Sequence, residues 1–441
     1  MVMGVDPAQA TNPTLPPPNP ALASPTLSPL PGTVGPSDVG NSSSTPSMMA
    51  LPVQPANSSS NGPGIDASDQ HKFYTFSVDL RETYDDNVNT ASSNPQSALE
   101  TTISPSVLVN FPMENTQFSA SYTFGATYYS NTGGTGSNVQ YSNQFIAQLK
   151  HDFSERFSLN ASDEVLDSTE PNLFGTTGTP YRNGQNISNA FSSGLSAQWT
   201  PLVGAQTTYA NTIVRYSDGA VATGQDSMEN TASQSVSFSL VPKISVNFGG
   251  VFDTITYDDV SRGYTSYSVF VGSTWQALPN VTASLRGGGS YTETQQTAFN
   301  GQTSNVGSLS PYVDLSASWQ IGERSSLSGD YSHEVTPSDQ VGANGQESDR
   351  ISANFNYAVS PLLSTHLQLV YTYSDISGGL INSSSLQSYD ETDYAVDAGA
   401  AYNFVKYFSL NLDITESGVS SQLPDRNYSR SQLSVGVRGT Y

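Results

Sequence analysis

The stretch "KFYTFSVDLRETYDDNVNT", residues 72–90, combines two patterns that bear on how the whole chain folds. Its first half alternates polar residues with the apolar residues Tyr74, Phe76, Val78 and Leu80. Successive side chains of a β-strand point to opposite faces, so this alternation predicts a strand with one apolar and one polar face. Its second half, residues 85–89, is acidic and rich in Asn. The apolar face could meet a protein core or lipid, and the acidic part could be a metal loop or a solvated turn.

The same alternation returns along the chain from residue 71 onward. Together with the opening stretch it predicts 18 strands. The other 17 are Ile103–Phe111, Phe118–Tyr128, Phe145–Phe153, Phe157–Val165, Phe191–Trp199, Thr207–Ile213, Val236–Leu240, Ile244–Phe252, Tyr267–Trp275, Val281–Tyr291, Val313–Trp319, Leu327–Tyr331, Ile351–Val359, Leu367–Tyr373, Tyr394–Phe404, Phe408–Ile414 and Leu433–Tyr441.

The connections between these strands also alternate in length. Short turns such as "FPMEN" (111–115) and "LVPK" (240–243) take turns with long polar stretches such as "YSNTGGTGSN" (129–138). Eight short turns and nine long connections are the count for an up-and-down barrel with both ends on the short-turn side. Bacterial outer-membrane barrels have short periplasmic turns and long external loops.

Aromatic placement decides between lipid and a protein core. Three tryptophans lie on the apolar face just before a short turn: Trp199, Trp275 and Trp319. Tyrosines gather near the long connections, so two aromatic levels bracket an aliphatic band, as at the two edges of a membrane. The opposite face is small or polar, and a closed barrel turns it toward water with no unpaired edge in lipid. The sequence therefore predicts an all-β transmembrane antiparallel up-and-down barrel of about 18 strands in the cell outer membrane.

Composition excludes several other classes of protein. The 441 residues carry a net charge of −23, which repels nucleic-acid phosphates. The chain has no cysteine, and therefore no disulfide or thiolate site. No apolar run reaches the ~20 residues that a membrane-spanning helix needs.

Residues 1–70 differ from the rest of the chain. They hold 14 of the 26 prolines and no Lys or Arg, and they show no signal-peptide pattern. Such a segment buries too little apolar area to offset its ordering entropy. We expect a disordered periplasmic leader at 1–70 and an outer-membrane barrel at 71–441. A plug or a partner-binding arm is the alternative for the leader.

Charged residues on the polar face are candidates for the pore lining. They are Asp79, Arg81, Lys150, Asp152, Glu164, Asp253, Arg286, Asp314, Asp330, Arg350, Asp397, Asp413, Arg430 and Arg438. Six lie at a similar distance from the short-turn ends and are candidates for a constriction: Asp79, Arg286, Asp314, Asp330, Asp397 and Asp413. They could filter solutes, or they could be solvated wall residues that pair with neighbours. The excess of acids over bases predicts a mild preference for cations.

Metal and catalytic sites have little support in the sequence. The patch "DDNVNT" begins like a calcium loop but has Thr90 at the position of the invariant Gly and Gln96 at that of the last acid. Asp and Asn at a strand end more often form turns, and no metal or cofactor is expected. The four histidines, His71, His151, His333 and His366, are not expected to form a catalytic dyad, which predicts a protein that is not an enzyme.

Two motifs carry a resemblance to known proteins. The end "SVGVRGTY" (434–441) is similar to the C-terminal strand of bacterial outer-membrane proteins that the barrel assembly machinery reads, although Gly439 departs from it. Residues 71–441 resemble the outer-membrane β-barrel porins, and "YDDNV" (84–88) resembles a branch often associated with exopolysaccharide systems.

This resemblance implies a pore for small hydrophilic solutes. The alternatives are a polysaccharide export barrel, with possible partners in the cell envelope, and a non-conducting structural or surface barrel. The implied partners are outer-membrane lipid, the barrel assembly machinery through the strand that ends at Tyr441, and lipopolysaccharide. Acidic loop sites such as Asp258-Asp259 could bind lipopolysaccharide phosphates through divalent ions.

Deletion of residues 1–65 behind a working signal peptide should leave barrel assembly intact, because the segment adds no strand. The shift in gel mobility that heating causes in a folded barrel should stay as in the full chain. Loss of the fast-migrating folded band would show instead that the leader is structural.

Overall fold

A computed structural model describes most of the chain after the predicted leader. The described residues are 73–132, 137–168, 185–217, 226–258, 262–297, 303–338, 343, 345–378, 380–381, 384–385, 388–423 and 426–441. The leader predicted at 1–70 lies outside them. Among the described residues, no helix is long and apolar enough to cross a membrane.

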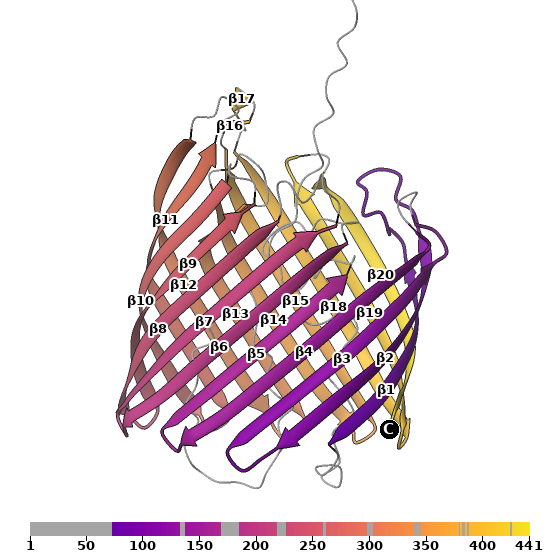
Figure 1. Cartoon of the computed structure of the whole chain (residues 1–441), viewed down its shortest axis with the longest axis horizontal. Helices are drawn as coiled ribbons and strands as arrows, with labels where there is room; N and C mark the ends of the chain where they lie inside the picture. Colours follow the sequence, from indigo (N-terminus) through magenta and orange to yellow (C-terminus); the bar gives the residue numbers. More distant parts are fainter. Residues whose placement is uncertain are drawn as a thin grey trace, which may run out of the picture.

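Eighteen antiparallel strands close into a single barrel, which confirms the predicted fold class (Figure 1). The strands are β1 Tyr74–Asp85, β2 Ala98–Pro112, β3 Thr116–Tyr129, β4 Val139–Ser154, β5 Phe157–Ser168, β6 Asn186–Thr200, β7 Val203–Tyr216, β8 Ser227–Val241, β9 Ile244–Tyr257, β10 Arg262–Leu278, β11 Val281–Thr297, β12 Thr303–Ile321, β13 Ser325–Thr336, β14 Gly345–Ser360, β15 Leu363–Ser377, β18 Tyr389–Val405, β19 Phe408–Ser421 and β20 Tyr428–Thr440. The short pairs β16 Leu380–Ile381 and β17 Ser384–Ser385 form a separate hairpin.

The barrel closes where the last strand returns to the first. The β1–β20 ladder runs from Ser77↔Thr440 to Asp85↔Gln432. Reciprocal backbone hydrogen bonds of 3.0 and 2.8 Å between Phe76 and Tyr441 extend it to the C-terminus. Both ends of the barrel chain therefore lie on the short-turn side, as the sequence predicts.

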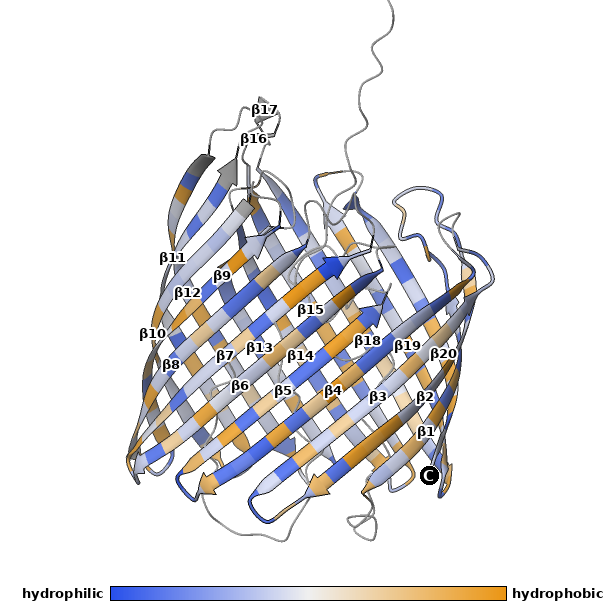
Figure 2. Cartoon of the chain, in the orientation of Figure 1, coloured by the Kyte–Doolittle hydropathy of each residue, from blue (hydrophilic) through white to orange (hydrophobic). Residues whose placement is uncertain are grey.

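The two faces of each strand differ as the alternation predicts. On β1, Leu80 is 54% exposed, whereas Asp79 beside it is 5% exposed and faces inward. The three girdle tryptophans, Trp199, Trp275 and Trp319, are about half exposed on the outer face near the short turns. Figure 2 shows the resulting alternation of hydrophilic and hydrophobic residues along the strands. The apolar face meets lipid, and the polar face lines the lumen.

The strands extend further toward the long loops than the sequence predicts. For example, β18 begins at Tyr389 instead of Tyr394, and β12 begins at Thr303 instead of Val313. The outer face in these extensions carries carboxylates held by neighbouring side chains, such as Glu82, which accepts a 2.7 Å hydrogen bond from Thr101. Beyond lipid the outer face need not be apolar, so the ladder continues after the apolar alternation has ended.

Thiol labelling tests the orientation of the barrel. We expect cysteine at Ser92, in the β1–β2 loop, to react on intact cells with a membrane-impermeant reagent. We expect cysteine at Glu323, in the β12–β13 turn, to react only after the outer membrane is opened. Both residues are exposed, so accessibility within the fold does not separate them. The reverse labelling pattern would contradict an external position for the long loops.

Candidate functional site in the barrel lumen

The inner face of the barrel holds all six predicted constriction residues. Strand alternation and register place them on the lumen side of β1, β11, β12, β13, β18 and β19, in the order Asp79, Arg286, Asp314, Asp330, Asp397 and Asp413. The same face otherwise carries mainly Ser, Thr, Asn and Gln. It is a hydrophilic wall with charges at particular strands.

One group of charges lies beside the closing seam, on β1, β19 and β20. Arg81 Nε is 3.6 Å from Asp79 Oδ1, and Arg81 Nη1 is 3.8 Å from Asp413 Oδ2. Arg438 Nε is 3.5 Å from the other oxygen of Asp79. Two of the predicted acids are therefore offset by arginines of β1 and β20.

His366 extends this group onto β15 and β18. Its Nε2 is 2.7 Å from Asp397 Oδ2 and 3.9 Å from Asp413 Oδ1. Gly399 lies opposite on β18, where a Cβ would collide with the imidazole and with the Asp413 carboxylate. The glycine thus provides the space in which the histidine meets both acids.

Two of the four histidines lie beside carboxylates, which the sequence analysis did not anticipate. His366 pairs with Asp397, and on the outer face His333 lies 3.0 Å from Glu347 and 3.0 Å from Asp349. Cross-strand register produced these pairs, and sequence spacing does not reveal it. Thr415 donates its hydroxyl to Asp397 at 2.7 Å and not to the imidazole, so the His366 group is not a nucleophile–base arrangement.

A second group lies on β11 and β12, around Arg286. This side chain is 1% exposed, with Nε 4.0 Å from Asp314 Oδ1 and its guanidinium carbon 5.5 Å from the centre of the Phe270 ring. A side chain at Gly272 on β10 would collide with Arg286. Asp330, on β13, accepts a 3.2 Å hydrogen bond from Ser352.

The six predicted residues therefore occupy two separate stretches of the wall. In the part of the chain that the structure describes, no ion pair joins the group beside the seam to the group on β11 and β12. Asp79, Asp314 and Asp413 pair with arginines, which is the arrangement expected of wall residues and not of a filter. Other acids of the inner face could still filter solutes.

Further inward-facing acids were missed because they lie in the strand extensions. They are Asp85, Glu100, Glu229, Glu334, Glu391 and Asp393. Continuing the alternation of each strand past its last apolar residue would have placed them on the inner face. They make the external half of the lumen more acidic than the sequence analysis indicated.

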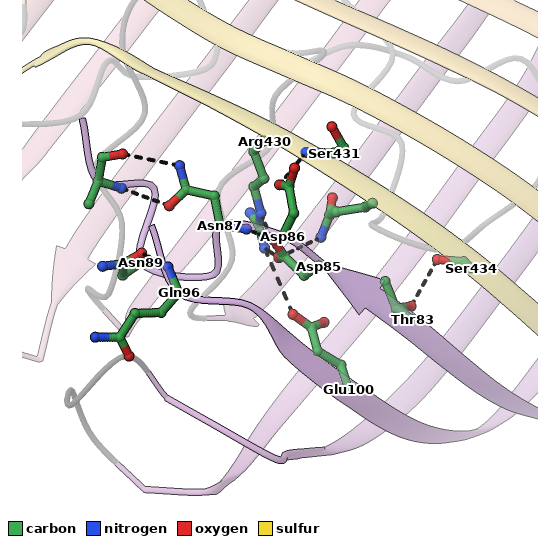
Figure 3. Close-up of polar contacts among 12 residues, drawn as sticks. Thr83, Asp85, Asp86, Asn87, Asn89, Gln96, Glu100, Arg430, Ser431 and Ser434 are labelled. Atoms are coloured by element: carbon green, nitrogen blue, oxygen red, sulfur yellow. Dashed lines mark hydrogen bonds and ion pairs between the residues drawn. The ribbon is translucent and has the colours of Figure 1, made fainter. Parts of the chain in front are cut away.

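The acidic stretch after the first strand forms a clamp across the closing seam (Figure 3). Asp85 is 0% exposed and accepts hydrogen bonds from Arg430 Nε at 2.7 Å and from Gln432 at 3.2 Å. Glu100 Oε1 lies 3.9 Å from the same arginine. Buried carboxylates here are compensated by a buried guanidinium from β20.

The next two residues bind backbone groups. Asp86 accepts a 2.7 Å hydrogen bond from the Ser431 amide. The Asn87 side chain donates to the Ser429 carbonyl at 2.7 Å and accepts from the Ala91 amide at 2.9 Å. The stretch thus ties the first loop to the last strand. No group of three or more His, Asp or Glu side chains among the described residues could hold a metal ion.

Comparison with protein families agrees with the barrel. Residues 74–441 match the family described as "Putative beta-barrel porin 2". The chain is similar to the solved outer membrane protein OpdK of Pseudomonas aeruginosa, with 9% identity, a TM-score of 0.44, and coverage of 83% of this chain and 99% of that one. It is also similar to OccAB4 of Acinetobacter baumannii, with 11% identity, a TM-score of 0.42, and coverage of 85% of this chain and 100% of that one. For the FrpB iron transporter of Neisseria meningitidis the identity is 11%, the TM-score is 0.42, and the coverage is 84% of this chain and 67% of that one. No curated protein matches the chain.

Replacing Arg430 by Gln should destabilise the barrel, because it leaves buried Asp85 without its cation. Breaking a buried ion pair in this way costs about 3–5 kcal/mol. The folded band on unheated gels should be lost at a lower temperature than in wild type. Lys150→Gln is the matched control, since the Lys150–Asp152 pair is about half exposed and worth ~0–1 kcal/mol. Equal melting of both variants would contradict a stabilising clamp.

Proposed function

Because the chain belongs to the "Putative beta-barrel porin 2" family and is an outer-membrane pore, we propose that it passes small hydrophilic solutes, with a mild preference for cations. The observation that carries this proposal is the inner face of the closed barrel, which is mainly hydrophilic. We propose no catalytic step for it.

The lining supports passage of solutes of a general kind. Eighteen strands enclose a lumen wider than side chains alone can fill. From β3 to β8 the inner wall offers mainly hydroxyl and amide groups, such as Ser119 and the hydrogen-bonded pair Thr208 and Ser233. Such groups exchange hydrogen bonds with water and with many polar solutes.

The proposed cation preference comes from acids that neutral side chains hold. Glu164 accepts a 2.7 Å hydrogen bond from Gln144. Asp253 accepts from Thr231 at 2.8 Å. Asp330 accepts from Ser352 at 3.2 Å and also interacts electrostatically with Arg350. By contrast, Asp79, Asp314 and Asp413 each lie within 4.0 Å of an arginine nitrogen. Acids that are hydrogen-bonded by neutral side chains are less neutralised than acids beside an arginine. Their electric field is focused into the channel by the low-dielectric wall.

A second candidate function is export of a polysaccharide. A cavity of about 380 Å³ lies beside the first loop, lined by residues that include Asp86, Asn87, Ser92, Asn427 and Tyr428. Carboxylate, amide and hydroxyl groups around an aromatic ring suit a sugar. An export barrel should be closed in a bilayer without its envelope partners, whereas a diffusion pore should conduct alone. A purified, folded barrel with no conductance would favour export or a structural role.

We expect the triple variant E164Q/D253N/D330N to shift the reversal potential in a salt gradient toward anions. The effect should weaken as salt rises, because the screening length falls from ~10 Å at 0.1 M to ~3 Å at 1 M. The matched control E82Q/D163N/E416Q removes three outward-facing acids and should keep the wild-type value. An anion-preferring wild type, or equal shifts in both variants, would overturn the proposed preference.

A further inference from the structure

The ladder between β12 and β13 ends before either strand does. Its nine pairs run from Ile321↔Ser325 to Val313↔His333, although β12 extends back to Thr303 and β13 forward to Thr336. The register would place Pro311 opposite Val335. Proline has no amide hydrogen to donate to a neighbouring strand, so the ladder loses a hydrogen bond at this pair.

A side chain from another strand binds the carbonyl that this proline cannot reach. The Tyr264 hydroxyl, on the inner face of β10, donates to the Val335 carbonyl at 2.6 Å. In a regular wall β10 and β13 would be three strand spacings apart, roughly 14 Å, which exceeds the length of a tyrosine side chain. β13 also contacts β11, across β12. The end of β13 has therefore separated from β12 and leans over the inner faces of β10 to β12, although it stays paired with β14 up to Thr336↔Gln346.

Glu334 lies on this displaced end, next to the residue that Tyr264 binds. It interacts electrostatically with Asp253 on β9, Asp314 on β12 and Arg350 on β14. β9 is four strands away along the wall, so this interaction agrees with the inward position that the Tyr264–Val335 hydrogen bond gives to the end of β13. The displaced end thus adds a carboxylate to acids that already line this side.

Ala343, in the connection after β13, also has defined packing partners. Ala343 packs with Ile376, Tyr389 and Leu423 in a small apolar cluster. Nearby, Arg426 forms two hydrogen bonds with buried Glu391, at 2.6 and 2.8 Å, which fix the β19–β20 connection against β18. Ala343 in the β13–β14 connection therefore packs against β15, β18 and the β19–β20 connection, which this ion pair fixes.

We propose that the inward end of β13, residues 334–336, forms the constriction of this pore and that Glu334 is the residue that selects cations there. This inference deepens the proposed diffusion function and rests on it. Tyr264 is a positioning residue that holds the constriction through Val335. The permeant class is small hydrated cations, inorganic or amine, because the acids Glu334, Asp253 and Asp314 face the path together while low-dielectric walls focus their field.

The selectivity of single-residue variants tests Glu334. In a potassium chloride gradient across a planar bilayer, E334Q should lose roughly a third of the wild-type cation selectivity, because one of three focused carboxylates is gone. E347Q is the matched control: Glu347 lies on adjacent β14, its side chain is 47% exposed on the outer face, and selectivity should stay unchanged. Tyr264→Phe keeps the ring but removes the hydroxyl, and should lower selectivity while the folded gel band persists.

Chemical cross-linking tests the position of the constriction independently of conductance. The chain has no native cysteine, so paired cysteines can be read directly. Ser266→Cys with Glu334→Cys should be joined by a short bifunctional maleimide, since Ser266 pairs with Asp253 on the inner face. Ser266→Cys with Glu347→Cys, which points outward, should not be joined.

The outcomes separate this inference from the proposed function. A cross-link in the first pair only, together with a selectivity loss in E334Q and Tyr264→Phe, supports the constriction. Absence of that cross-link overturns the inward position. If the wild type conducts and prefers cations but E334Q has the same selectivity, Glu334 is not the selecting residue. The pore proposal then still stands. A folded barrel that does not conduct at all ends the pore proposal, and the filter with it.

Discussion

Every backbone amide and carbonyl inside a bilayer needs a hydrogen-bond partner from the protein, because lipid offers none. An open sheet of the same 18 strands would still present two unpaired edges. The β1–β20 ladder removes both edges, and the whole fold depends on that closure. The Asp85–Arg430 clamp lies at the external end of this joint, where the ladder stops and the first loop begins. We therefore interpret the acidic stretch after the first strand as part of the closure.

Closure also determines what the interior can do. A closed wall of 18 strands leaves a hydrophilic space, and cross-strand register then decides which charges meet across it. Arginines from β1, β11 and β20 offset some of the carboxylates, whereas hydroxyl and amide groups hold others. The wall departs from regularity at Pro311, and there a strand end enters the lumen with Glu334. In this barrel a local loss of pairing provides an inward-facing carboxylate.

Lipid is the reason that so much of the fold could be predicted. It requires alternation on every spanning strand, so 18 strands, their order and their inner faces follow from apolar positions such as Leu80. Outside lipid the requirement ends, and the strand extensions with Glu100 and Glu391 escaped prediction. The pair His366–Asp397 depends on register between strands 31 residues apart, which alternation does not reveal. The departure of β13 has a visible cause in Pro311, but the sequence does not show that Tyr264 would bind the freed carbonyl.

The clamp that closes the barrel joins Asp85 and Arg430, which are 345 residues apart in the chain. Every other strand finds a partner that was made just before or just after it, so those pairings can form stepwise as hairpins. The closing joint must wait for the last strand. A chain that stops before residue 430 would keep both its edges and an uncompensated buried carboxylate. The clamp can therefore form only when the last strand is present, so a truncated chain cannot close the barrel in this way.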